Sequence, residues 1–323
     1  MPALPIKIVI VTAFEPDGGS APGEFRHWRE REGLNQRIDF PTGYRPLQSD
    51  GKGVLGIITG VGAARAASSI MALGLDSRFD LTAAYFVICG IAGIDPAIGT
   101  LGSVIIPEYV VDGTFAHEID AREIPADWPD GFVPIGKSLP YEKPRADRFN
   151  GEDGIVFRLN SSLVTWAYEL TRNTPLLDSD QMAERRKQFE PAVTAHRAPS
   201  VLRGDELSST AFWHGKLLSQ RARRWVAYQT QELGQYAITG MEDTGILQSL
   251  TQLASAGRID FARILILRSA SNFDQQRAGI DAAESLAETR IATYSAYLPA
   301  LENVYRVGKR VIEALLAGGP SRE

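Results

Sequence analysis

Three short runs of β-branched residues, two of them separated by an alanine-rich stretch, constrain the fold most. The runs are residues 7–13 (KIVIVTA), 54–59 (VLGIIT) and 83–89 (AAYFVIC), and residues 60–75 (GVGAARAASSIMALGL) lie between the last two. The length and composition of the runs are typical of buried strands, and the alanine-rich stretch is typical of a helix. A strand–helix–strand unit at this spacing predicts a largely parallel sheet covered by helices, and therefore an α/β fold.

The same alternation continues towards the C-terminus. In residues 236–247 (YAITGMEDTGIL), an apolar run typical of a strand is followed by a helical pattern that we expect to begin at Asp243. The other predicted elements are a strand over residues 99–113 that is bent at Pro107, a helix over 161–170, an interior strand over 263–271 and a helix from about Pro299.

Two polar segments interrupt the pattern. Residues 120–155 and 174–204 are rich in Pro, Asp, Gly and Arg, and apolar order resumes after each of them. We therefore expect long surface excursions rather than linkers, within one domain that covers residues 1–323.

Composition excludes several classes of function. The chain has 323 residues with a net charge of −5, and this mild charge does not favour a nucleic-acid or anionic-membrane surface. The longest nearly apolar window, residues 81–94, is shorter than the roughly 20 residues that a spanning helix needs. We expect a soluble protein, in the cytoplasm as written, or periplasmic or extracellular if a native signal was removed. The single cysteine, Cys89, lies in an apolar run and is expected in the core.

Common catalytic motifs are absent from the sequence. There is no G-x-S-x-G, Walker or C-x-x-C motif, and the four histidines show no spacing typical of metal ligands. The segment GVGAARA at residues 60–66 lacks the third glycine of a dinucleotide-binding loop. We therefore expect neither a metal nor a nicotinamide cofactor.

Polar residues follow the predicted strands, at the end of the sheet where α/β proteins bind ligands. An unpaired carboxylate at Glu242, between an apolar strand and an apolar helix, would be costly, so we expect a function for it. For Asp243 and Asp274 a helix cap or a loop carboxylate is the preferred interpretation. The candidate residues at the strand ends are Glu15, Asp17, Gly90, Gly93, Met241, Glu242 and Asn272.

These segments, in this order, resemble the nucleoside phosphorylase superfamily, which includes methylthioadenosine/S-adenosylhomocysteine nucleosidase. Within it the chain is similar to the purine nucleoside permease group, from about residue 7 to residue 316. The resemblance implies a three-layer αβα sandwich around a mixed, partly barrel-like sheet, usually in a homo-oligomer. The segments that carry it are KIVIVTAFEPD, APGEFRHW, CGIAGIDPAIGTLGSVIIPEYVVDGT, VDGTFAHEIDARE, LNSSLVTWAYELT, GMEDTGI and LRSASN.

The resemblance also implies roles for individual residues. Glu242 matches the glutamate that accepts hydrogen bonds from the ribose 2′- and 3′-hydroxyls, and Met241 matches the methionine beneath the sugar. Asn272 matches the position that contacts the purine N7, and an asparagine there favours 6-oxopurines. Phe212 lies near the position of the aromatic residue that stacks on the base, with Trp213 and His214 as alternatives.

The sequence leaves open whether the nucleophile is water or phosphate. Asp17 falls at the position of the nucleosidase base, with Glu15 as a second choice, and Gly90 and Gly93 would line the nucleophile pocket. Phosphate is a possible co-substrate, with Arg65 as its arginine, although Arg65 could equally be a surface residue. Asp17 is shorter than the usual glutamate, and Asn272 cannot act as an acid.

We therefore expect a purine-ribonucleoside-binding protein that cleaves the N-glycosidic bond, by hydrolysis or phosphorolysis, in nucleoside uptake or salvage. The alternative is a binding protein without catalysis, which assists a separate membrane carrier or serves as a storage protein.

Overall fold

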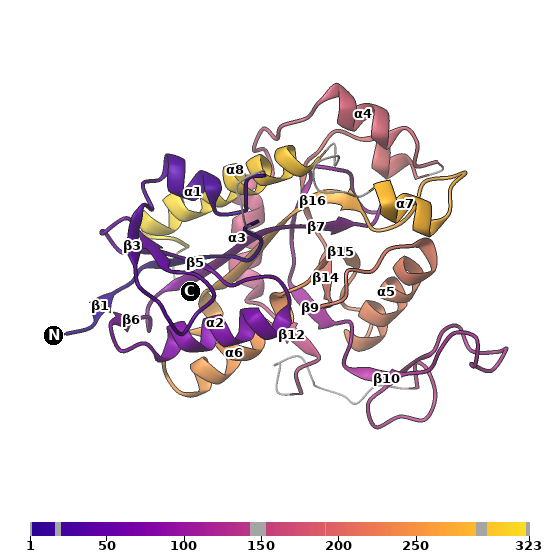
Figure 1. Cartoon of the computed structure of the whole chain (residues 1–323), viewed down its shortest axis with the longest axis horizontal. Coiled ribbons are helices and arrows are strands. Elements are labelled where there is room, and N and C mark those ends of the chain that lie inside the picture. Colours follow the sequence, from indigo (N-terminus) through magenta and orange to yellow (C-terminus); the bar gives the residue numbers. More distant parts are fainter. Residues whose placement is uncertain (1, 17–20, 143–152, 191, 289–295, 321–323) are drawn as a thin grey trace.

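The computed structural model describes residues 2–16, 21–142, 153–190, 192–288 and 296–320. Over these residues a large mixed β-sheet lies between two layers of helices (Figure 1), which is the αβα arrangement expected from the sequence. The largest group of buried apolar side chains fills the space between the sheet and its helices.

The long strand β7, Tyr85–Ile94, organises the sheet. It pairs in parallel with β2 (Ile8–Thr12) and β16 (Ile264–Phe273), and its last residues pair antiparallel with β15 (Tyr236–Gly240). Because β7 has three partners, the sheet forks there and curves. The other strands of this sheet are β3 (Gln36–Ile38), β4 (Leu47–Ser49), β5 (Val54–Ile58), β8 (Val104–Ile106), β9 (Tyr109–Asp112), β12 (Val156–Arg158), β13 (Val201–Arg203) and β14 (Asp205–Ser208).

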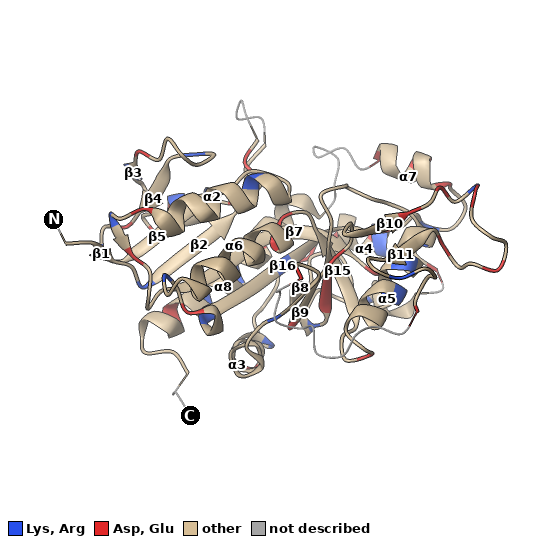
Figure 2. Cartoon of the chain, turned by 90° about the horizontal axis from the view of Figure 1, so that it is seen from below, with Lys and Arg blue, Asp and Glu red and all other residues tan. Residues whose placement is uncertain are grey.

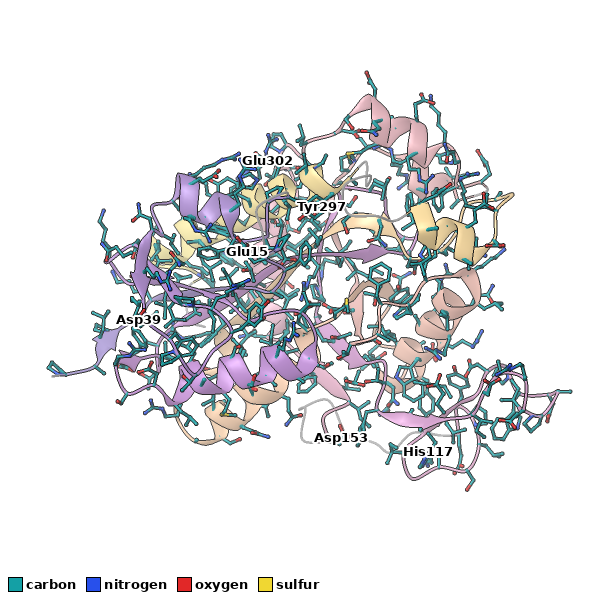
Figure 3. The ribbon with its side chains drawn as sticks, viewed as in Figure 1. Glu15, Asp39, His117, Asp153, Tyr297 and Glu302 are labelled. Carbon is teal, nitrogen blue, oxygen red and sulfur yellow. The ribbon has the colours of Figure 1, made fainter. Side chains whose placement is uncertain are left out.

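Two further strand pairs lie outside this sheet. β1 (Leu4–Pro5) pairs with β6 (Phe79–Asp80), and β10 (Ala116–Glu118) pairs with β11 (Phe132–Pro134). The segment that carries β10 projects from the lower right of the molecule in Figure 1, and His117 marks it in Figure 3.

Helices cover both faces of the sheet. On one face α2 (Ala63–Leu75) packs against α6 (Asp243–Ser255), and on the other α8 (Tyr297–Leu316) packs on β7 and β16. Figure 2 shows α2 and α6 side by side from below, with acidic and basic residues interspersed along the ribbon. The remaining helices are α1 (Arg26–Arg31), α3 (Ser161–Thr171), α4 (Asp180–Arg186), α5 (Lys216–Gln229) and α7 (Ala282–Glu288), with short 3-10 turns at Val193–His196 and Phe261–Arg263.

Most of the predicted elements are present, with one difference that affects the site. Pro107 separates β8 from β9, α6 begins at Asp243, and Cys89 is buried, all as predicted. The strand predicted over residues 83–89 is longer in the structure, because β7 continues through Gly90 and Gly93 to Ile94. These residues remain paired with β16 to the end of the strand.

The excursion over residues 174–204 is more than a surface loop. It contains α4, in which Met182 is fully buried, and it ends in β13, which pairs with β8 in the main sheet. In the excursion over 120–155, Phe132 packs edge-to-face on Trp225 at 4.9 Å, while residues 143–152 lie outside the described part. Apolar residues within both segments therefore contribute to packing.

Candidate functional site

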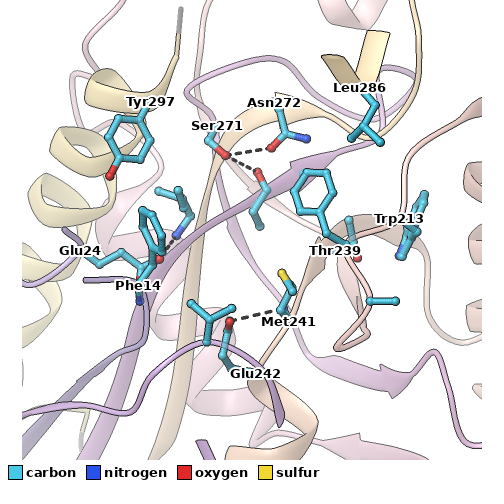
Figure 4. A pocket seen from close by; sticks show the side chains of 17 residues that line it. Phe14, Glu24, Trp213, Thr239, Met241, Glu242, Ser271, Asn272, Leu286 and Tyr297 are labelled. Carbon is cyan, nitrogen blue, oxygen red and sulfur yellow. Dashed lines mark hydrogen bonds between the residues drawn. The ribbon is translucent and has the colours of Figure 1, made fainter. Parts of the chain in front are cut away.

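A cavity of about 400 Å³ lies where the ends of β2, β7, β15 and β16 converge. Phe14 follows β2, Gly93 belongs to β7, Glu242 follows β15 and Asn272 belongs to β16, and all four line the cavity. Figure 4 shows Glu242 and Met241 at one end and Asn272 and Leu286 at the other. The volume is within the range typical of small-molecule sites, at the edge where α/β sheets bind ligands.

Glu242 is a buried carboxylate in the wall of this cavity. Its Oε1 accepts a hydrogen bond from the Gly62 amide at 3.3 Å, and its Oε2 accepts hydrogen bonds from Arg268 Nη2 at 3.1 Å and from the Met241 amide at 3.3 Å. Burial raises the pKa of Glu242 to about 7, although Arg268 acts in the opposite direction. The carboxylate therefore keeps part of its acceptor capacity for a ligand and changes charge near neutral pH.

Arg268, at the centre of β16, holds the start of α6 in place. Its side chain is fully buried, and its Nε donates to Asp243 Oδ2 at 2.9 Å while Nη2 donates to Asp243 Oδ1. The interpretation of Asp243 as a helix cap is wrong, because Asp243 is the first residue within α6 and its carboxylate is paired with Arg268. A guanidinium that bridges Asp243 and Glu242 fixes the position of both carboxylates.

Glu206, on β14, is a further buried acid beside this arginine, and the sequence did not single it out. Neither carboxyl oxygen has a hydrogen-bond donor among the described residues. Burial, and next the neighbouring Asp243, raise the pKa of Glu206 well above its usual range. Glu206 therefore holds its proton more strongly than an ordinary glutamate, and this proton can be donated to Asp243. A side chain at Gly240 would place its Cβ 2.5 Å from Glu206 Oε1, so a glycine is required there.

Glu24 is a second carboxylate in the cavity wall that sequence reasoning missed. Its Oε2 accepts hydrogen bonds from the amides of Ala13 at 2.8 Å and Phe14 at 2.9 Å, and its Oε1 accepts one from Ile91 at 2.8 Å. Burial raises the pKa of Glu24 in spite of these bonds and of Arg268. Glu24 stands in APGEFRHW, a segment that carried the resemblance, but nothing in that segment marks the acid as buried.

Gly90 does not line the cavity, in contrast to the expectation, whereas Gly93 does. A Cβ at Gly90 would lie 2.2 Å from Arg268 Nη1 and 2.8 Å from Glu24 Oε1. The glycine therefore leaves room for the arginine and the glutamate.

Three other candidates are not found in the cavity wall. Asp17 lies outside the described residues, and Glu15 and Arg65 lie apart from the cavity. Glu15 lines a separate hollow, where its Oε2 accepts a 3.4 Å hydrogen bond from the Phe25 amide and its Oε1 lies 3.6 Å from Arg29. Arg65 is exposed on α2, with its guanidinium 5.5 Å from the centre of the Tyr44 ring, and does not line the cavity.

The far end of the cavity combines an amide with aromatic rings. Asn272 Nδ2 donates to the Phe273 carbonyl at 3.0 Å, and Asn272 Oδ1 accepts from Ser271 Oγ at 3.0 Å, which leaves one N–H and one lone pair of the amide. Phe212, whose exposed fraction is 49%, and Trp213 both line this cavity, whereas His214 lines a neighbouring one.

The charged residues that line the cavity, among those described, are acidic. Glu24 and Glu242 face the cavity, and none of the described residues that line it is Lys or Arg. Asp274, for which a helix cap or loop was expected, is buried behind this wall. Its Oδ2 accepts hydrogen bonds from Tyr236 at 2.7 Å and Ser219 at 2.8 Å. Asp274 lies in the bend directly after β16, so the interpretation as a loop carboxylate is confirmed, whereas its burial was not expected.

Comparison with known structures defines the class of fold. A 5′-methylthioadenosine/S-adenosylhomocysteine nucleosidase from Colwellia psychrerythraea in complex with adenine is 16% identical, with 98% of each chain covered and a TM-score of 0.56. A futalosine hydrolase of Helicobacter pylori is 14% identical, with 94% of this chain and 97% of that chain covered and a TM-score of 0.51. This likeness shows the nucleoside phosphorylase-like fold.

The chain belongs to the purine nucleoside permease (NUP) family, whose model matches residues 5–319. A probable purine nucleoside permease of Schizosaccharomyces pombe is 31% identical over 263 residues, which are 80% of this chain and 74% of the relative. The purine nucleoside permease of Candida albicans is 30% identical over 80% of this chain and 63% of its own length. In the described part of the chain, no helix is both long and apolar enough to span a bilayer.

Proposed function

We propose that the cavity binds a purine ribonucleoside and that the protein cleaves its N-glycosidic bond with water. The observation that carries this proposal is the buried Glu242, next to Met241, at one end of a cavity whose other end holds Asn272 and two aromatic rings. The fold neighbours, one of which is in complex with adenine, support the same class of ligand.

Glu242 is suited to the ribose. A carboxylate accepts hydrogen bonds from two vicinal hydroxyls at once, and such charge-assisted bonds are short and strong. The bonds from Gly62 and Arg268 hold the carboxylate in position. Loss of one ribose hydroxyl would leave an acceptor unpaired, at a cost of about 1–3 kcal/mol.

Asn272 and the aromatic residues are suited to the base. Phe212 or Trp213 would stack on the purine. The free N–H of the Asn272 amide would donate to N7, and its free lone pair would accept from an amino group at the 6-position. In our proposal this pairing favours adenosine over inosine and guanosine, in contrast to the 6-oxopurine preference that the resemblance implied.

Glu24 is the carboxylate best placed to activate water, because it lines the cavity and its pKa is raised by burial. The water oxygen would bond to C1′ as the C1′–N9 bond breaks and its electron pair leaves with the base. Glu24 would accept one proton of the water, and the departing base would take a proton from solvent, because Asn272 has no acidic proton to give.

Water is favoured over phosphate by the charge of the lining. A phosphate dianion would meet Glu24 and Glu242, with no Lys or Arg among the described lining residues to neutralise it. Arg65, the arginine considered for phosphate, lies elsewhere on α2.

Binding without cleavage is a second candidate. It is favoured by Asn272, which cannot protonate the leaving base, and by the permease names of the relatives. In that case the protein would capture nucleosides for a separate carrier.

The two candidates are separated by incubating the purified protein with inosine, guanosine or adenosine, with and without phosphate, and analysing the products by chromatography. Free base and ribose without phosphate are expected, and ribose-1-phosphate would contradict the choice of water. Calorimetry on the same nucleosides should show binding that Glu242→Ala abolishes.

Glu24→Gln should retain binding and lose turnover if water is activated there, and Glu169→Gln, on the exposed side of α3, serves as the control. Binding with no free base in the wild type would favour the capture function. Unchanged affinity in Glu242→Ala would contradict the site itself.

A further inference from the structure

A second cavity of about 340 Å³ adjoins the first at the end where we place the base. Ser271 and Asn272, consecutive residues of β16, line both cavities. In Figure 4 these two residues stand together at this end of the first cavity. The volume of the second cavity is within the range of sites that hold a small molecule of their own.

The charged residues of the second cavity are already paired. Arg185 Nη2 lies 2.7 Å from Glu288 Oε2, and Arg185 Nη1 donates to Gln188 Oε1 at 3.2 Å. Glu184 pairs with Lys187. An ionic ligand would have to break these pairs, so a neutral ligand fits better.

Gln275 is a buried polar residue of this cavity whose side chain has no partner. It follows β16, lines the cavity and is 9% exposed. Its amide forms no hydrogen bond with any described residue, whereas the next residue, Gln276, accepts one from the Lys216 amide at 2.9 Å. A buried amide of this kind gains a hydrogen bond when a ligand fills the cavity.

The Gln275 amide is also within reach of a ligand. His214 Nδ1 lacks a partner among the described residues too, but that atom is enclosed by protein, and its Nε2 lies 3.0 Å from Ser285 Oγ. Neither polar atom of the Gln275 amide is enclosed in this way. Gln275 is therefore the residue from which we infer the chemistry of the ligand.

A carboxamide is suited to a ligand that presents a donor beside an acceptor. Its N–H groups donate and its carbonyl accepts, so it can form two hydrogen bonds with one edge of such a ligand. Glutamine pairs in this way with adenine, whose 6-amino group donates and whose N7 accepts.

The apolar part of the wall suits a flat ring. Leu101, Phe189 and Phe273 line the cavity, and the ring centres of the two phenylalanines are 4.0 Å apart. Aromatic side chains contribute a large apolar surface for packing against a planar ligand. Adenine is planar and neutral at pH 7, so it matches the rings as well as the paired charges.

We propose that the second cavity binds free adenine through two hydrogen bonds to the Gln275 amide. This site is separate from the nucleoside site, so the inference goes beyond the proposed function and does not require cleavage. Adenine is also the base that cleavage of adenosine in the first cavity would release beside this site.

The experiment counts the molecules of radiolabelled adenine bound per chain by equilibrium dialysis. Gln275→Leu, which keeps a side chain of similar size but has no amide, should bind one molecule fewer than the wild type. Gln252→Leu, on the exposed side of α6, is the matched control and should bind as many as the wild type. This comparison holds even if the first cavity also takes adenine, because Gln275 does not line that cavity.

A second ligand tests the pairing. Unsubstituted purine lacks the 6-amino donor, so it should bind to the site that depends on Gln275 about tenfold or more weakly than adenine. Equal affinity of purine and adenine at this site would contradict the two hydrogen bonds.

Adenosine binding and thermal unfolding of Gln275→Leu should match those of the wild type, which shows that the variant is folded. If adenosine binds but Gln275→Leu takes up as much adenine as the wild type, the inference is overturned and the proposed function stands. If the wild type does not bind adenosine and adenine is still lost in Gln275→Leu, the proposed function fails and the inference stands.

Discussion

The protonation state of Glu242 decides what this residue can bind. Its carboxyl is surrounded by Arg268, Glu24 and Asp243, and burial raises its pKa to about 7. Only the ionised form can accept hydrogen bonds from two ribose hydroxyls on its oxygens, and the protonated form loses acceptor capacity. Burial thus couples ribose recognition to pH.

We predict that inosine binds more tightly as the pH rises from 6 to 8, with the change centred near pH 7, because the ionised fraction of Glu242 rises in that range. Calorimetry at pH 6, 7 and 8 measures this change. The dependence should be smaller for 2′-deoxyinosine and absent in Glu242→Gln. A slope in Glu242→Gln equal to that of the wild type would assign the effect to another group, such as Glu24.

Residue patterns, together with the resemblance to a known superfamily, predicted part of the site. Met241, Glu242, Gly93, Asn272 and Phe212 all line one cavity, although none of their roles has been tested. Glu24 and Glu206 were missed because an acid in a sequence is usually exposed, and only the fold shows that these two are buried.

At the scale of elements, the close contact of α2 with α6 positions the Glu242 carboxylate. Gly245 lies in the first turn of α6, and a Cβ there would be 2.1 Å from the Ala63 carbonyl oxygen of α2. Ser249 Oγ also donates to the Ala67 carbonyl at 2.9 Å. The Gly62 amide at the start of α2 donates a hydrogen bond to Glu242. A shift of α2 against α6 would therefore move this donor away from the carboxylate.

We predict that Gly245→Ala lowers the free energy of unfolding by about 1–3 kcal/mol, the usual cost of overpacking, and weakens inosine binding as well. Urea unfolding and calorimetry measure the two effects. Gln252→Ala, on the exposed side of the same helix, is the matched control and should change stability by no more than about 0.5 kcal/mol. Wild-type stability in Gly245→Ala would show that the two helices are not in close contact.

For the whole molecule, buried acids link stability to pH. Burial and the nearby Asp95 raise the pKa of Asp274 to about 7, from a usual value near 4. Between about pH 4 and pH 7, the carboxyl group of Asp274 keeps its proton in the folded protein, whereas the same group has released its proton in the unfolded chain. The contribution of Asp274 to the free energy of unfolding therefore falls as the pH rises, by about 1.4 kcal/mol per unit between roughly pH 4 and 7.

We predict that Asp274→Asn removes this part of the pH dependence. The stability of the wild type relative to the variant should fall from pH 5 to pH 7 and change little above it, as measured by urea unfolding at each pH. In the control Asp120→Asn the relative stability should be constant over this range, because the pKa of Asp120 is lowered to about 2 and it is ionised in both states. A constant difference for Asp274→Asn would mean that Asp274 is ionised when buried.

The sequence by itself determined the strands, the helices and the residue at which α6 begins, because local composition and periodicity carry that information. Its motifs also indicated the family. The tertiary structure decided which polar groups meet. Glu24 pairs with Ile91, and Glu242 with Gly62 and Arg268, across long stretches of chain. Burial, shared protons and the second cavity arise from such contacts between distant segments, and no local pattern in the sequence encodes them.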